Sequence, residues 1–115
     1  MLFRIRNRAG HTAWAGGSRR SAQGMDQMLA RNDIGFEPGR SWTSPRTSII
    51  YPVEFKVRAG GADYQIVPMM DDSELDSRLS TGTVYWEGAV RALKDGRQVG
   101  RGYLELTGYG GALKL

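Results

Sequence analysis

Cysteine is absent from the 115-residue sequence, and histidine occurs once, as His11. Without cysteine the chain forms no disulfide and offers no thiolate as nucleophile or metal ligand. A single histidine cannot build a histidine-rich metal site, and we expect His11 to be a surface or structural residue. Any chemistry must therefore use carboxylates, hydroxyls, arginine or lysine, and the sequence predicts no metal and no cofactor.

Long apolar runs are also missing. No segment approaches the roughly 18 apolar residues that a membrane-spanning helix requires, and the basic N-terminus lacks the apolar stretch and cleavage site of a secretory signal. We expect a cytoplasmic protein from this sequence, or a periplasmic or secreted one if the chain is a fragment. The length, with 40% hydrophobic and 24% charged residues, is typical of one globular domain over residues 1–115. A multidomain enzyme is excluded.

Positive charge is concentrated in the first half of the chain. Residues 1–58 contain ten basic and four acidic side chains, whereas residues 59–115 contain six and eight. Thirteen of the basic residues are arginine, the side chain that best matches phosphate oxygens. A net charge of +4 without regularly interleaved aromatics nevertheless does not indicate nucleic acid. We interpret the arginines near the N-terminus as the solvated face of one strand: Arg4, Arg6 and Arg8.

Alternation of apolar and polar residues dominates the sequence and predicts a mostly β protein. Residues 25–29 have one alternative, a single helical turn. Pro45 lacks an N–H group, so residues 41–47 should form a loop or a sheet edge. Acidic residues near Ser73 are typical of a helix start and predict a short helix over 73–79. The predicted strands before the C-terminal region cover residues 2–7, 11–18, 24–29, 33–37, 49–58 and 62–68.

The C-terminal region has the clearest hairpin pattern. Residues 83–94 and 97–109 are rich in β-forming residues, and Asp95-Gly96 between them adopts positive φ readily, as a type I′ turn requires. Without a bulge, Glu87 and Glu105 fall on opposite faces of this hairpin. One β-bulge, for which the glycines at positions 88, 100 and 102 are suited, would bring both to the same face. The sequence leaves both registers open.

The 16 glycines, several of them inside the last hairpin, predict strongly curved strands. Curved antiparallel strands close into a barrel, and roughly seven to nine short strands fit a barrel of about eight. Such a barrel either fills its interior with side chains or holds one small ligand. The predicted fold class is all-β, an antiparallel β-barrel with at most a short helix.

Four motifs in one order give the chain a family resemblance. They are WTSPRT at 42–47, YPV at 51–53, YWEGAV at 85–90 and GYLELTGY at 102–109. Together they resemble the C-terminal half of the AttH-like family, which includes carotenoid 1,2-hydratase, also called hydroxyneurosporene synthase. The opening residues 1–6 are similar to the strand that begins this half, so the resemblance covers nearly the whole chain. It implies a lipocalin-like barrel for an apolar ligand.

Full-length members of that family have two lipocalin-like domains, and related proteins include hydratases and fungal cyclases of the Diels–Alder type. The resemblance therefore implies that an N-terminal partner domain is missing from this sequence. We expect either a fragment or a stand-alone relative that replaces the partner domain by forming a homodimer.

Glu87 and Glu105 are the candidate catalytic residues. Two carboxylates in a barrel can act as general acid and base, because burial and mutual repulsion separate their pKa values. Protonation of an alkene, which hydration requires, needs such an acid. The alternative is that each glutamate makes a structural hydrogen bond to a neighbouring tryptophan, tyrosine or arginine.

The aromatic residues of the motifs are the candidate ligand-binding set. Facing inward, they would line an apolar cavity and their hydroxyls would orient a polar end of a ligand; otherwise they fill a packed core. Arg46 could bind a ligand carboxylate or pair with Glu87 or Glu105. The full set is Trp42, Arg46, Tyr51, Tyr85, Trp86, Tyr103 and Tyr109.

Four acidic residues gather within 71–76, but they lack the spacing of a calcium loop, and we interpret them as a solvated loop before the short helix. The sequence thus favours binding of a small hydrophobic or amphipathic molecule in the barrel. The alternatives are a hydratase, isomerase or cyclase that uses Glu87 or Glu105, and a homodimeric interaction module. Neither nucleic acid nor a membrane span is expected.

Overall fold

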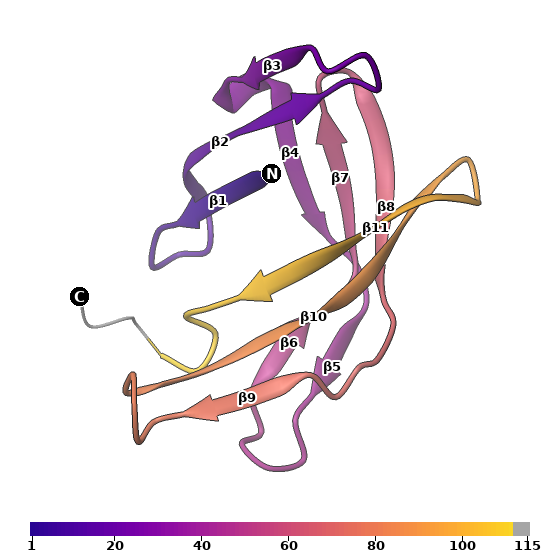
Figure 1. The fold of residues 1–115 in the computed structure, drawn as a ribbon. Helices are drawn as coiled ribbons and strands as arrows, with labels where there is room; N and C mark the ends of the chain where they lie inside the picture. The colour runs from indigo at the N-terminus through magenta and orange to yellow at the C-terminus, as the bar shows by residue number, and fades with distance from the viewer. Residues whose placement is uncertain (112–115) are drawn as a thin grey trace.

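The computed structural model describes residues 1–111, which form eleven strands and one short 3-10 helix (Figure 1). The helix, η1, covers Arg31–Asp33 and leads directly into β4. The strands are β1 (Leu2–Arg6), β2 (Thr12–Arg20), β3 (Asp26–Leu29), β4 (Ile34–Pro38), β5 (Ser41–Thr43), β6 (Ile50–Pro52), β7 (Phe55–Ala59), β8 (Ala62–Pro68), β9 (Glu74–Ser77), β10 (Thr83–Lys94) and β11 (Arg97–Leu106).

These strands form three antiparallel sheets. The first has the order β1-β2-β3, and the largest has the order β11-β10-β8-β7-β4, with β9 paired to the beginning of β10. β5 and β6 form a two-stranded ribbon. The largest sheet curls into a half-barrel, and the first sheet crosses one end of it (Figure 1). The all-β, antiparallel, lipocalin-like architecture predicted from the sequence is confirmed.

β10 and β11 form the predicted hairpin. Asp95 and Gly96 both have positive φ, 50° and 75°, so the turn has the backbone signs of type I′. The register of the pair shifts between Ala92 and Leu93, which leaves Val99 as an extra residue in β11. This is the β-bulge that the sequence left open, one residue before the glycine at position 100.

The bulge decides which side chains of the hairpin share a face. Glu87 pairs directly with Glu105, and Trp86 pairs with Leu106. Because side chains alternate along a strand, the two glutamates lie on one face and Trp86 and Leu106 on the other. Trp86 and Leu106 are buried, so the glutamates lie on the outer face.

Two segments for which the sequence suggested a helix form strands. Residues 73–79 contain β9 instead of the predicted short helix, because Glu74–Ser77 pairs with β10. One isolated helical turn is costly to nucleate, so pairing with an existing strand prevails. Residues 26–29 form β3 against β2, which makes the helical alternative for 25–29 wrong. The long strand predicted over 49–58 is divided in two, and β6 ends at its proline.

Two groups of buried side chains hold the sheets together. The larger lies within the curl of the largest sheet and contains Tyr51, Val53, Phe55, Val57, Trp86, Val90 and Leu106. The smaller joins the first sheet to β4 and β7 and contains Ala15, Leu29, Ile34 and Ala59. Within residues 1–111, no helix has the length and apolar character needed to cross a membrane.

Candidate functional site: a groove between β1 and β11

A groove of about 560 Å³ lies between β1 and β11. Among the described residues, each of these strands pairs with a neighbour on one side only, so they are free edges of their sheets. Phe36 from β4 and Phe55 from β7 also line the groove. Its walls come from β1 with the residue before it and from β11 with the residues that follow it: Met1, Leu2, Phe3, Arg4, Arg6, Tyr103, Leu104, Glu105, Leu106, Thr107 and Tyr109.

Arg4 and Arg6 line this groove, so the prediction that they form a solvated face of β1 is wrong. Arg4 Nη1 donates a hydrogen bond to the Phe36 carbonyl oxygen at 3.2 Å, and the Arg4 guanidinium lies 5.5 Å from the centre of the Phe36 ring. Arg6 Nη2 donates to the Thr107 carbonyl oxygen at 3.1 Å, and the Arg6 guanidinium lies 3.8 Å from the centre of the Tyr109 ring. Aromatic faces attract such cations, which explains their place beside apolar side chains.

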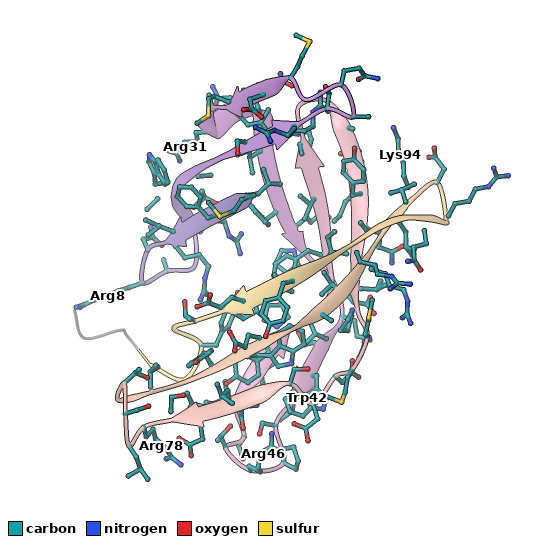
Figure 2. The ribbon with its side chains drawn as sticks, viewed as in Figure 1. Arg8, Arg31, Trp42, Arg46, Arg78 and Lys94 are labelled. Atoms are coloured by element: carbon teal, nitrogen blue, oxygen red, sulfur yellow. The ribbon has the colours of Figure 1, made fainter. Side chains whose placement is uncertain are left out.

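The opposite side of β1 is apolar and exposed. The Phe3 and Trp14 rings lie 4.4 Å apart, centre to centre, and Ile5 pairs with Trp14 across the first two strands. Trp14 is 48% exposed. Arg8 lies beyond the strand and points away from the sheets (Figure 2), as the solvated interpretation predicts. The arginines of β1 are therefore half-buried on the groove side, and the apolar Phe3 and Ile5 are the more exposed side chains, the reverse of the usual arrangement.

The groove has an uneven charge distribution. No carboxylate of residues 1–111 lies within 4.0 Å of the Arg4 or Arg6 guanidinium, whereas Arg40 and Arg46 each pair with two carboxylates. The carbonyl acceptors of Arg4 and Arg6 orient the guanidiniums without neutralising their charge. Glu105 is the one carboxylate among the lining residues, and it belongs to the opposite wall.

One of the two predicted acid–base residues lines this groove. Glu105 lines it and Glu87, its cross-strand partner, does not. Tyr103 lies on the same outer face of the hairpin, 67% exposed. Local desolvation and the charge of Glu87 raise the pKa of Tyr103 above its ordinary value. The bulge thus brings Tyr85, Glu87, Tyr103 and Glu105 onto one outer face.

Glu74 is a buried carboxylate that the sequence did not single out. Its side chain is 1% exposed and accepts hydrogen bonds from Ser44 Oγ at 2.7 Å, Thr47 Oγ1 at 2.6 Å and the Tyr51 hydroxyl at 3.0 Å. Burial acts to raise the pKa of Glu74, but the three hydroxyls and Arg46 together hold that pKa below its ordinary value. Burial and the hydrogen bond to Glu74 raise the pKa of Tyr51. Glu74 is therefore an ionised, fully partnered acceptor that fastens the loop between β5 and β6 to β9.

The prediction that Arg46 pairs with Glu87 or Glu105 is wrong. The two Nη atoms of Arg46 lie 2.8 and 2.5 Å from the carboxylate oxygens of Asp72, and its Nε lies 3.5 Å from Glu74 Oε1. Figure 2 shows Arg46 at one end of the molecule, where β5 and β6 join. Arg46 thus completes the shell around Glu74 and is not among the residues that line the groove.

The acidic residues within 71–76 neutralise arginines. Asp71 forms a bidentate pair with Arg40, and Asp76 pairs with Arg78. The hydrogen bonds from these arginines lower the pKa values of Asp71 and Asp76. In the described part of the chain, no cluster of three possible metal-ligating side chains occurs. The expected solvated loop before a helix is therefore an ion-paired segment that leads into β9.

The predicted aromatic ligand set divides into two groups. Tyr51 and Trp86 are fully buried in the core. Trp42 stacks on Tyr51 with ring centres 6.3 Å apart, and the Tyr109 ring lies 6.0 Å from that of Tyr51. Of the predicted ligand residues, only Tyr103 and Tyr109 line the groove. Glu105, predicted as a catalytic residue, also lines it, and the sequence prediction missed the remaining lining residues.

The curled antiparallel sheets and the groove at their free edges define a lipocalin-like half-barrel protein. A family model described as AttH-like matches residues 1–109, and the chain belongs to that family. The chain is also similar to the crystal structure of a protein named as an AttH candidate from Nitrosomonas europaea. The identity is 47% and the TM-score 0.88, over 94% of this chain and 34% of that one. The chain thus spans about a third of that protein's length, and no curated protein matches it.

Proposed function

We propose that the chain binds a small hydrophobic or amphipathic molecule in the groove between β1 and β11. The observation that carries the proposal is a space of about 560 Å³ with mainly aromatic and aliphatic walls at the free edges of the sheets. Ligand sites are typically of this size, largely apolar, with a few placed polar groups. Membership of the AttH-like family and the half-barrel fold are compatible with this function.

Filling the groove tests the proposal. Thr107→Trp places a bulky ring in the groove, whereas the matched control Val99→Trp places the same ring at the exposed bulge of β11. Titration with the neutral apolar dye Nile red should show binding by the wild type and V99W, and at least about tenfold weaker binding by T107W, a loss of about 1.4 kcal/mol. Equal binding by all three proteins contradicts the groove as the site.

A second candidate is an enzyme of the hydratase, isomerase or cyclase type. The observation that favours it is the direct pairing of Glu87 with Glu105 at the edge of the groove, because adjacent carboxylates can divide acid and base roles. Incubation with a long-chain alkene acid should give a product isomerised or heavier by one water. Glu87→Gln and Glu105→Gln should each abolish that turnover, and full turnover in both variants removes the acid–base role.

We propose further that residues 1–115 are one lipocalin-like domain, equivalent to the C-terminal half of longer family members, with an interface on the outer face of the first sheet. Phe3, Ile5, Trp14 and Met28 are exposed there, and apolar patches of this kind mark interaction sites. The Nitrosomonas chain extends well beyond the matched part, which leaves room for a partner domain. The isolated chain should form a homodimer through this face, and Trp14→Ser should shift its sedimentation towards the monomer. A monomeric wild type at all concentrations contradicts the homodimer.

A further inference from the structure

Within residues 1–111, two guanidiniums without an ion-pair partner stand in one wall of a mainly apolar groove. Arg4 and Arg6 are two residues apart on β1, so they project to the same side with Cα atoms about 7 Å apart. Both are partly buried, and burying a charge without neutralising it costs free energy. We propose that the groove takes an amphipathic monocarboxylate, whose carboxylate binds at Arg4 and Arg6 and whose apolar chain lies along the groove. This inference rests on the proposed function and names its ligand class.

Both guanidiniums have donors to spare. A guanidinium carries five N–H donors, and within residues 1–111 Arg4 and Arg6 each donate one side-chain hydrogen bond, to a backbone carbonyl. Those two bonds and the neighbouring aromatic rings fix the positions of the guanidiniums before a ligand arrives. A positioned guanidinium binds a carboxylate through parallel charge-assisted hydrogen bonds. The head-group site is therefore already organised.

The remaining charges set the orientation of the ligand. Glu105 belongs to the β11 wall and repels a carboxylate from that side. The third positive charge on the β1 side is the N-terminal ammonium of Met1, which lies at the other end of β1 and donates to the Ser18 carbonyl oxygen at 2.9 Å. The carboxylate thus belongs at the β1 wall, and the chain packs on the apolar lining: Leu2, Phe36, Phe55, Leu104 and Leu106.

Matched C12 probes separate the head group from the chain. We expect dodecanoate to bind the wild-type protein at least about tenfold more tightly than dodecan-1-ol, because charge-assisted hydrogen bonds are stronger than neutral ones. Dodecyltrimethylammonium should bind more weakly than the alcohol. Isothermal titration below the critical micelle concentrations measures all three affinities, and the preference for dodecanoate should decrease with added salt.

Single substitutions then locate the head group. Arg4→Gln and Arg6→Gln should each weaken dodecanoate about tenfold and leave dodecan-1-ol unchanged. Arg8→Gln removes the same charge from the exposed turn after β1, outside the groove, and should change neither affinity. Circular dichroism confirms that each variant is folded. If a groove variant does not fold, the wild-type ratio of acid to alcohol still decides the proposal.

The outcomes separate this inference from the proposed function. Equal affinity for dodecanoate and dodecan-1-ol overturns the carboxylate preference while the apolar groove stands. An equal loss of dodecanoate binding in R8Q and the groove variants overturns the assignment of the head group to Arg4 and Arg6. If neither C12 probe nor Nile red binds, the proposed function fails and the inference fails with it.

Discussion

Glu74→Gln removes the charge of the buried β9 carboxylate that Ser44, Thr47 and Tyr51 surround, and it keeps the size of the side chain. In the native protein the carboxylate accepts three hydroxyl hydrogen bonds of 2.6 to 3.0 Å. A hydrogen bond to a charged group contributes about 1.5–3 kcal/mol to stability, against about 1 kcal/mol for a neutral pair. Replacing three bonds of the first kind by the second should lower the free energy of unfolding by roughly 1.5–6 kcal/mol.

The new amide adds a cost, because its NH₂ group needs an acceptor. Ser44 Oγ already accepts the backbone N–H groups of Arg46 and Thr47 at 3.2 and 3.3 Å, and Thr47 Oγ1 accepts that of Ile49 at 3.3 Å. These hydroxyls are therefore oriented as donors towards position 74. A buried donor left unsatisfied costs about 1–3 kcal/mol, which places the expected loss in the upper part of the range.

Urea unfolding at pH 7, followed by tryptophan fluorescence, to which the buried Trp86 contributes, measures the change. Asp72→Asn is the matched control, because it removes one charge from the exposed ion pair with Arg46, and surface pairs contribute little. For E74Q, the urea concentration at the midpoint of unfolding should be well below that of D72N. A loss in E74Q of no more than about 0.5 kcal/mol, the range of ordinary surface substitutions, refutes the reasoning.

Two further predictions concern pH and packing. Because the pKa of Glu74 is lowered in the folded protein, its contribution to stability is present above the unfolded-state pKa of about 4.3 and is lost as pH falls through the folded pKa. Wild-type stability should therefore fall more steeply than that of E74Q below about pH 4, and parallel curves contradict this. A Cβ at Gly88 would lie 2.8 Å from Ser73 Oγ and 3.0 Å from Trp86 Cη2, whereas one at Gly100 meets nothing within 4 Å. Gly88→Ala should thus lower the free energy of unfolding by about 1–3 kcal/mol, measured by thermal unfolding. Gly100→Ala introduces no crowding, so an equal change in the two variants would show that the neighbours of Gly88 move aside without strain.

Local turn chemistry made part of the fold predictable. Asp95-Gly96 is sufficient to place the last hairpin because few other dipeptides adopt two positive φ angles. The bulge was not predictable in position, since glycines 88, 100 and 102 were equivalent candidates and the extra residue is Val99. β9 was mistaken for a helix because acidic residues near a serine are the same signal whether they cap a helix or pair with arginines.

The candidate site was less predictable, because it depends on which face of β1 turns inward. Alternation separates Arg4 and Arg6 from Phe3 and Ile5, but it does not say which pair meets the core. The usual assumption is that the apolar pair faces inward, whereas here Arg4 and Arg6 are half-buried and Phe3 and Ile5 are the more exposed pair. Glu74 was missed for another reason: its hydroxyl donors lie 23 to 30 residues earlier in the chain, beyond any local pattern.

The segments by which the chain resembles its family serve two different places: residues 1–6 and 102–109 supply most of the groove lining, whereas the WTSPRT motif at 42–47 supplies none of it. The WTSPRT motif supplies Ser44, Arg46 and Thr47 to the shell around Glu74, whose hydrogen bonds are all satisfied within the protein. Among residues 1–111, Arg4 and Arg6 each donate one side-chain hydrogen bond and keep further donors beside mainly apolar walls. This separation has a measurable consequence. E74Q should unfold at a lower urea concentration than the wild type, yet bind Nile red with wild-type affinity while it is folded. T107W should bind Nile red more weakly and keep the wild-type free energy of unfolding. A single variant that loses both properties to the same degree would mean that the cluster and the groove are one cooperative unit.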